Sequence, residues 1–269
     1  MVYYASTINL YAALAQLDRV FGYEPKGRGF ESLTPCQKPP RKLGGFCLSN
    51  GGMILSTEIY LIRHGESEGN KLAVVLGHSN LGLTELGKKQ ADLTAKHLKD
   101  QGLSPAAIYS SDLARAHSTA ESAASLFGMD ITADVGLREL YAGAWEMKSY
   151  TEISETFSKS YNAWMKNIGR AKCDDGESVA ELQDRMVTVI SRIAGKHDGE
   201  VIFIFTHATA IRTFAAYCMG KTLDEIKDVP WPTNSSVTRV RYSNKKFSLI
   251  EYSRDDFMGG LITKFSNNI

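Results

Sequence analysis

The segment Ile59-Tyr60-Leu61-Ile62-Arg63-His64-Gly65-Glu66-Ser67 decides the fold of this chain. Its first half is a short apolar run with β-branched and aromatic residues, which is typical of a buried strand. The run ends in a guanidinium, an imidazole and a glycine, which are poor core residues. A histidine at such a strand end can act as a nucleophile, and the adjacent arginine can neutralise an anion that it attacks. We therefore expect Arg63 and His64 to belong to a functional site.

Around this segment the chain alternates between strand-like and helix-like patterns. Thr84 and the capping box Ser178-Val179-Ala180-Glu181 predict helix starts, and Gly128 predicts a helix end. Ser110-Ser111-Asp112 can cap another helix. The expected elements are strands at 58–62, 107–109, 131–133 and 201–205, helices at 84–101, 112–127, 178–194 and from 207 to about 220, and a closing hairpin of strands at 237–242 and 247–252.

Strands that are separated by helices predict an α/β fold with a mostly parallel central sheet covered by helices on both faces. In such sheets, ligands bind outside the carboxyl ends of the strands. Arg63 and His64 end one predicted strand, and Thr206-His207 ends another. Arg115 lies in the first turn of the helix that follows a third strand. We expect these side chains to meet at one edge of the sheet.

Composition excludes several classes of protein. The 269 residues contain 31 Lys and Arg against 30 Asp and Glu, so no charge excess favours nucleic acid or an anionic membrane as partner. No apolar stretch is long enough to span a bilayer. The four cysteines are scattered and form no C-x-x-C pair, and no H-x-H, H-E-x-x-H or D-x-D pattern suggests a metal site. We expect a cytoplasmic protein with no metal and no cofactor; its oligomeric state stays open.

Residues 1–52 differ from the rest and predict an irregular extension, because the stretch 23–52 is rich in Gly, Pro, Ser and Lys. The tetrapeptide Gly29-Phe30-Glu31-Ser32 is also what results when the T-arm of a tRNA gene is translated in one frame. One hypothesis is therefore that translation begins at Met53 and that residues 53–269 form the whole protein, a single catalytic domain. The alternative is a genuine disordered extension.

Leu61-Ile62-Arg63-His64-Gly65-Glu66-Ser67-Glu68-Gly69-Asn70 resembles the signature of the histidine phosphatase superfamily, in its phosphoglycerate mutase-like branch. Further stretches agree with the same family in the same order, up to about Gly220. They are Leu83-Thr84-Glu85-Leu86-Gly87, Ser110-Ser111-Asp112-Leu113-Ala114-Arg115-Ala116, Leu137-Arg138-Glu139 with Gly143-Ala144-Trp145-Glu146, and Thr206-His207 with Ile211-Arg212. Within the family, the chain is most similar to the broad-specificity phosphatases.

The resemblance implies a role for each matched residue. His64 is implied as the nucleophile that accepts the phosphoryl group, and Glu139 as the proton donor to the leaving alcohol. The phosphate pocket is implied to consist of Arg63, Asn70, Arg115 and His207. These roles are chemically coherent, because paired guanidinium donors suit phosphate oxygens and charge spreads over those oxygens during transfer.

The function that we expect is a metal-independent phosphomonoesterase, which acts on small phosphorylated molecules through a phosphohistidine on His64. The first alternative is a phosphoglycerate mutase. Residues 144–176 contain aromatics, scattered lysines and Arg170 but no proline, whereas the mutases carry extra arginines and a proline run there. A phosphate-binding module without turnover is the second alternative. The sequence does not identify the substrate.

Two departures from the family pattern concern the substrate side. Ala208 follows His207 where the family commonly has glycine, and Met147 follows Trp145-Glu146 where the family also has glycine. Several aromatic or long side chains could either line a leaving-group pocket or belong to the core, and the core is the commoner outcome. They are Tyr141, Trp145, Tyr150, Tyr161, Trp164 and Met165. For Arg212 we expect a structural role, and for His78 a loop position near the site.

Overall fold

The computed structural model describes residues 47–49 and 52–263, all of which fall within the unit Leu43–Ile269. The predicted extension of residues 1–52 therefore lies almost entirely outside the described residues, and the start at Met53 stays a prediction. Within the described part, β1 (Cys47–Ser49) pairs antiparallel with β2 (Gly52–Ile54). The sequence reading did not include this pairing.

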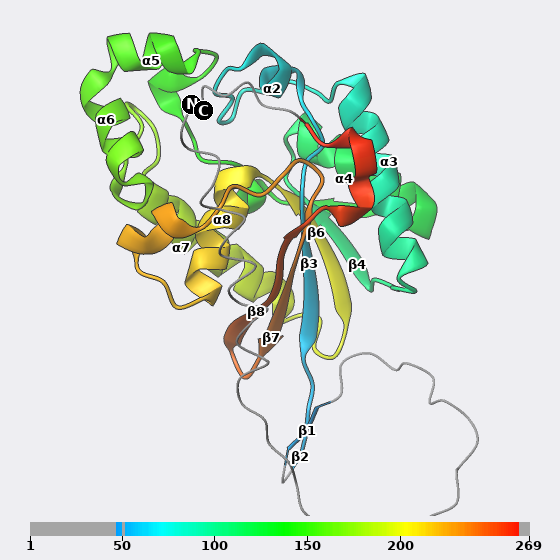
Figure 1. Ribbon diagram of the computed structural model, residues 1–269. Helices are drawn as coiled ribbons and strands as arrows, with labels where there is room; N and C mark the ends of the chain where they lie inside the picture. The colour runs from blue at the N-terminus through cyan, green and yellow to red at the C-terminus, as the bar shows by residue number, and fades with distance from the viewer. Residues whose placement is uncertain (1–46, 50–51, 264–269) are drawn as a thin grey trace, which may run out of the picture. The chain divides into compact units, whose positions relative to one another are not determined.

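A six-stranded sheet carries the rest of the fold, in the order β5-β4-β6-β3-β7-β8 (Figure 1). Its strands are β3 (Thr57–Arg63), β4 (Ala107–Ser110), β5 (Ile131–Ala133), β6 (Val201–Thr206), β7 (Val237–Ser243) and β8 (Lys246–Arg254). The first four run parallel, whereas β7 pairs antiparallel with both β3 and β8. The mostly parallel sheet and the closing hairpin are as predicted. Asn244 and Lys245 form the hairpin turn with φ of 51° and 60°, which matches the right-handed twist of the strands.

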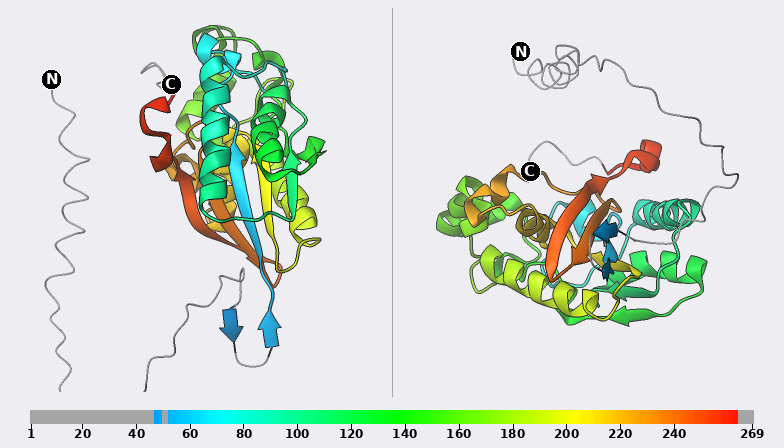
Figure 2. Two further views of the ribbon diagram at one scale, coloured as in Figure 1. Left: turned by 90° about the vertical axis from the view of Figure 1, so that its right-hand side faces the viewer. Right: turned by 90° about the horizontal axis from the view of Figure 1, so that it is seen from below.

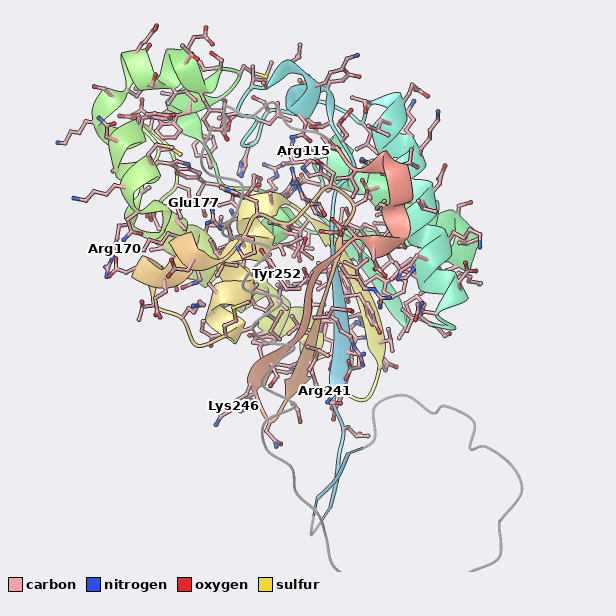
Figure 3. All side chains as sticks on the ribbon, in the orientation of Figure 1. Arg115, Arg170, Glu177, Arg241, Lys246 and Tyr252 are labelled. Carbon is pink, nitrogen blue, oxygen red and sulfur yellow. The ribbon has the colours of Figure 1, made fainter. Side chains whose placement is uncertain are left out.

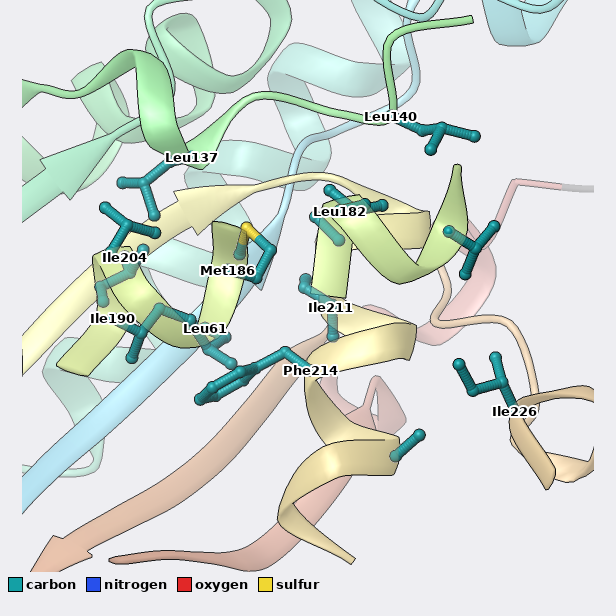
Figure 4. Close-up of a cluster of buried hydrophobic side chains, with 14 of the residues drawn as sticks. Leu61, Leu137, Leu140, Leu182, Met186, Ile190, Ile204, Ile211, Phe214 and Ile226 are labelled. Carbon is teal, nitrogen blue, oxygen red and sulfur yellow. The ribbon is translucent and has the colours of Figure 1, made fainter. Parts of the chain in front are cut away.

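Helices cover both faces of the sheet (Figure 2). α3 (Glu85–Asp100) and α4 (Ala114–Phe127) pack on one face, and α7 (Val179–Ala194) and α8 (Ala208–Cys218) pack on the other. Successive side chains of a strand point to opposite faces of the sheet, so the strands contribute to a hydrophobic cluster on each face. Ile59 and Leu61 of β3 face α7 and α8, and Ile62 faces α3 and α4. Figure 4 shows the first of these clusters, in which Leu61 and Ile204 of the sheet meet Met186, Ile190 and Phe214 of the helices.

Local capping explains where the long helices begin and end. Thr84 Oγ1 accepts the Gly87 N–H, Ser178 and Glu181 form the predicted capping box, and Gly128 ends α4 with φ of 66°. The prediction that Ser110-Ser111-Asp112 caps α4 is wrong. The N-cap is Leu113, whose apolar side chain cannot accept a capping bond, and Ser111 Oγ accepts the N–H of Leu113 and not one from the first turn of α4.

Several short helices had no counterpart in the sequence reading. They are α2 (Glu68–Leu72), α5 (Tyr150–Thr156), α6 (Ser158–Lys166) and the 3-10 turns η1 (Val135–Leu137), η2 (Gly143–Trp145), η3 (Ile168–Arg170), η4 (Leu223–Asp228) and η5 (Asp256–Leu261). Ile153 is the buried residue of α5, and Tyr161 and Trp164 of α6 are only partly buried against the core, so neither short helix shows the long buried stripe of α7. No helix in the described ranges combines the length and apolar character needed to cross a membrane.

Candidate active site

The parallel register of β3 and β6 brings two histidines together at the carboxyl edge of the sheet. Arg63 pairs with Thr206 across the two strands, and the His64 N–H donates to the Thr206 carbonyl over 3.0 Å. The residues that follow this pair, His64 and His207, therefore lie at the same level along the two strands. The rings of His64 and His207 lie with their centroids 5.2 Å apart.

His64 is held as a neutral imidazole with a defined tautomer. Its Nδ1 lies 2.7 Å from the Gly65 carbonyl oxygen, and because a carbonyl only accepts, Nδ1 carries the proton. Nε2 then keeps its lone pair. Burial lowers the pKa of His64 well below the ordinary value, and the nearby charges of Arg115 and Arg63 lower it further. The ring is therefore an uncharged nucleophile at neutral pH.

Gly65 is required by the close approach of another backbone segment. A Cβ at this position would lie 2.4 Å from the carbonyl oxygen of Gly87, at the start of α3. The Gly65 N–H donates to Thr119 Oγ1 of α4 over 3.0 Å. Glycine thus lets the loop that carries His64 lie directly on two helices, which fixes the position of the imidazole.

Two buried arginines flank the histidine. Arg63 is 6% exposed and Arg115 is 1% exposed, and burial lowers the pKa of each to about 10, so both stay cationic at neutral pH. Arg115 donates to the carbonyls of Gly77 and Ser79 over 2.8 and 2.9 Å. Its Nε–H is buried and has no hydrogen-bond partner among the described residues. A buried donor without an acceptor is unfavourable until an anion binds to it.

Asn70 offers an amide donor beside the arginines. Its Oδ1 accepts from the Ser67 N–H and hydroxyl and from the side chain of Asn234, at 3.1, 3.1 and 3.2 Å. These bonds occupy the oxygen and leave the NH2 group as the end that can face a ligand. Asn234 also donates to the His64 carbonyl, so one amide links the two site residues.

Glu139 lies against the N-terminus of α8. Its carboxylate accepts the backbone N–H groups of Thr209 and Ala210 at 3.1 and 3.2 Å, and that of Leu140 at 2.8 Å. The positive end of the helix dipole favours an acid side chain there. Behind it, Arg185 donates to the carbonyls of Gly136, Arg138 and Glu139, while the Glu177 carboxylate binds Arg185 at two nitrogens. Glu177 therefore holds the arginine that in turn holds the Glu139 segment.

His207 is fully buried, and its Nε2 lies 2.9 Å from Ser111 Oγ at the end of β4. Burial lowers its pKa well below the ordinary value, with Arg115 and His64 contributing. Its Nδ1 has no hydrogen-bond partner among the described residues. His207, which was predicted to belong to the phosphate pocket, therefore lies against the ring of His64 and is not among the residues that line the cavity.

A cavity of about 340 Å³ opens in front of these groups. Arg63, His64, Asn70, Arg115 and Glu139 all line it, so the residues singled out from scattered segments converge on one place. The remaining wall is largely apolar. A volume at the lower end of the range for small-molecule pockets suits a small ligand. Within the described ranges, no group of three or more His, Cys, Asp or Glu side chains could hold a metal ion.

The aromatic residues that the sequence left undecided divide into two sets. Trp145, Tyr150 and Trp164 line the cavity, whereas Tyr141, Tyr161 and Met165 do not. Trp231 also lines it, and the sequence reading missed it. The available signal was its setting in Pro230-Trp231-Pro232, an aromatic side chain displayed by a rigid loop.

The remaining expectations concern residues near the site. Arg212 is structural as predicted, since it donates to the carbonyls of Val229 and Lys227. His78 lies in the loop held by Arg115, and its Nε2 is 2.9 Å from the Glu139 carbonyl oxygen. Ala208 lines the cavity. Met147 has φ of 62°, the left-handed region that glycine tolerates, which explains why glycine suits this position.

Comparison with known proteins agrees with this geometry. Residues 59–255 match the histidine phosphatase superfamily (branch 1). The chain is 37% identical over 161 residues to "Phosphoglycerate mutase-like protein 4" of Arabidopsis thaliana, covering 58% of this chain and 68% of the relative. It is 31% identical over 204 residues to "Metal-independent phosphoserine phosphatase" of the same plant, covering 73% and 81%.

Among solved structures, YhfR of Bacillus stearothermophilus is similar, with a TM-score of 0.71 and 28% identity, over 75% of this chain and 99% of that one. Fold and sequence therefore agree on the assignment. The chain belongs to the histidine phosphatase superfamily, branch 1.

Proposed function

We propose that this protein is a phosphomonoesterase that hydrolyses small phosphorylated molecules without a metal ion, through a phosphohistidine on His64. One observation carries the proposal. The neutral ring of His64 is tied through Nδ1–H to the Gly65 carbonyl, so the lone pair of Nε2 is available between two buried guanidinium groups. A nucleophile beside fixed positive charge is what transfer of an anionic phosphoryl group requires.

In the first step, Nε2 of His64 attacks phosphorus, the N–P bond forms, and the bond from phosphorus to the ester oxygen breaks. The leaving oxygen takes a proton from the Glu139 carboxyl. In the second step, water attacks phosphorus while the Glu139 carboxylate accepts a proton from it. The N–P bond then breaks, which releases phosphate and restores the neutral imidazole.

The hydrogen bonds of Glu139 suit the second step directly. Both of its oxygens accept backbone N–H groups, so the side chain is oriented as a carboxylate. When one oxygen carries the proton for the first step, both oxygens keep acceptor capacity, so these N–H groups continue to hold the carboxyl in place.

Charge stabilisation falls to the groups around the imidazole. Arg63 and Arg115 offer guanidinium nitrogens, and the unpartnered Nε–H of Arg115 gains an acceptor when a phosphate oxygen binds. Their deep burial means that water screens their charge little. Charge that develops on the equatorial oxygens during transfer is stabilised by donors already in place.

The position and pairing of Arg170 favour hydrolysis over mutase activity. Its guanidinium pairs with Asp224 at 2.8 Å on the surface, where both side chains are more than half exposed. Figure 3 shows Arg170 at the outer edge of the fold and Arg115 in its interior. Arg170 is thus not available to bind the carboxylate of a phosphoglycerate. The relative named as a metal-independent phosphoserine phosphatase also supports hydrolysis.

The test is release of inorganic phosphate from p-nitrophenyl phosphate and from a panel of phosphate esters. We expect turnover that EDTA does not change, and a loss of about a thousandfold or more in His64→Ala. His117→Ala is the matched control, since His117 lies on the outer side of α4 and pairs with Glu121. We expect it to retain full activity.

The intermediate can be trapped directly. Brief reaction with ³²P-labelled substrate is expected to leave an acid-labile label on wild type and none on His64→Ala. Efficient conversion of 3-phosphoglycerate to 2-phosphoglycerate would instead establish the mutase. Tight phosphate binding with no turnover of any ester would establish a binding module.

A further inference from the structure

Two chemically different groups of side chains line the cavity in front of His64. The first group, which we assign to phosphate, consists of His64, Arg63, Arg115 and Asn70. The second group is aromatic and apolar, and it comprises Trp145, Trp164, Trp231 and Tyr150 with Val75 and Leu140. The alcohol part of a phosphate ester bound to the first group must contact the second.

The tryptophans form a continuous aromatic wall. The ring centroids of Trp145 and Trp164 are 5.8 Å apart in an edge-to-face arrangement, and those of Trp164 and Trp231 are 6.5 Å apart at an interplanar angle of 23°. The sequence contains three tryptophans, and all of them line this cavity. Aromatic faces bury large apolar area and favour apolar or aromatic ligands.

Arg212 holds the outermost ring in place. Its guanidinium carbon lies 4.3 Å from the centroid of the Trp231 ring, and its nitrogens donate to the carbonyls of Val229 and Lys227. Trp231 is 42% exposed, yet this stacking gives it a fixed orientation. Arg212 is therefore engaged by the Trp231 ring and by two backbone carbonyls, and it does not line the cavity.

The charge of the cavity discriminates between classes of leaving group. Among the described residues that line it, the cationic side chains are Arg63 and Arg115, and both belong to the group assigned to phosphate. A carboxylate on the leaving group would lie against tryptophan and tyrosine, close to the carboxyl of Glu139. Burying a charge without a partner is strongly unfavourable.

We infer that the substrates are phosphate monoesters of uncharged, apolar or aromatic alcohols, and that phosphorylated amino acids and hydroxy acids are poor substrates. This inference rests on the proposed phosphatase function for the catalytic step. The apolar wall itself concerns binding, so the two can be tested apart. The volume of about 340 Å³ restricts the alcohol to a small molecule.

The binding test uses phosphonates, which cannot be hydrolysed at the carbon–phosphorus bond. Dissociation constants of methylphosphonate, hexylphosphonate and 3-phosphonopropionate are measured by calorimetry with the full chain. Each buried methylene strengthens binding roughly fourfold, so we expect hexylphosphonate to bind at least about tenfold tighter than methylphosphonate. We expect 3-phosphonopropionate to bind no tighter than methylphosphonate. Equal binding of the alkyl pair, or tighter binding of the carboxylate, would overturn the inference.

Paired variants locate the effect. Trp231→Ala is expected to reduce the preference for hexylphosphonate over methylphosphonate about threefold or more. Tyr217→Ala is the matched control, because Tyr217 is an aromatic residue of similar exposure, 46%, that does not line the cavity. A preference that is the same in wild type and Trp231→Ala would show that the wall does not bind the alkyl chain.

Kinetics separate the inference from the proposed function. Release of phosphate from phenyl phosphate with at least about tenfold higher kcat/KM than from O-phosphoserine or 3-phosphoglycerate supports both. Faster release from the two acids would overturn the substrate class while the phosphatase function stands. No release from any ester, together with the hexyl preference, would overturn the phosphatase function and leave the apolar binding site intact.

Discussion

Acid is expected to destabilise this protein through the two buried histidines of the site. Burial and the nearby arginines lower the pKa of His64 and of His207 well below the ordinary value of 6.5. Below pH 6.5 the unfolded chain therefore binds protons at these positions that the native state does not bind. The free energy of unfolding rises with pH wherever the unfolded state holds more protons, so it falls as the pH drops through this window.

The size of the effect follows from the unfolded state alone. Between pH 7 and pH 5, a histidine with an ordinary pKa goes from mostly neutral to almost fully protonated. Integration over this interval gives about 2 kcal/mol for each histidine that stays neutral in the native state, and about 4 kcal/mol for the pair. Both side chains are buried, with His64 4% exposed, so solvent screening reduces this figure little.

The assay is urea unfolding of wild type, His64→Gln, His207→Gln and the double variant at pH 7.0 and 5.0, without phosphate. Each single variant is expected to lose about 2 kcal/mol less than wild type between the two pH values, because glutamine does not titrate. The part of the pH-dependent loss that comes from carboxylates is the same in wild type and variants, so it cancels when their losses are compared. Above pH 7.5 all four proteins are expected to show parallel pH dependence. Identical losses in wild type and the double variant between pH 7 and 5 would refute the reasoning.

Three further substitutions test particular positions. Met147→Gly is expected to have a free energy of unfolding about 1 kcal/mol higher than Met147→Ala, because φ of 62° strains any residue with a Cβ; equal free energies of unfolding would contradict this. Gly65→Ala is expected to cost about 1–3 kcal/mol and lower kcat, since its Cβ would lie 2.4 Å from the Gly87 carbonyl oxygen; unchanged activity and stability would exclude the contact. Arg185→Met is expected to lower kcat more than it raises KM, because Arg185 holds the Glu139 segment through its carbonyls; a change in KM alone would argue against that positioning role.

Those parts of the protein that depend on neighbours along the chain could be predicted from the amino-acid sequence. The apolar run before Arg63 became β3, the Thr84 cap and Gly128 stop lie where expected, and the hairpin at 237–252 formed. These signals are local, since alternation, capping and turn chemistry involve residues only a few positions apart. The site residues were recognisable because they stand in family motifs that occur in order; His64, Arg115 and His207 also follow a strand or open a helix.

The contacts that complete the site became visible only in the folded chain. The N–H groups that hold Glu139 come from Thr209 and Ala210, seventy or more positions away, and Asn234 reaches His64 across 170 positions. The aromatic wall joins Trp145 of η2 and Trp164 of α6 to Trp231 in a distant loop. The physical reason is that strand register and helix packing set such contacts, and neither is written in the periodicity of any one segment.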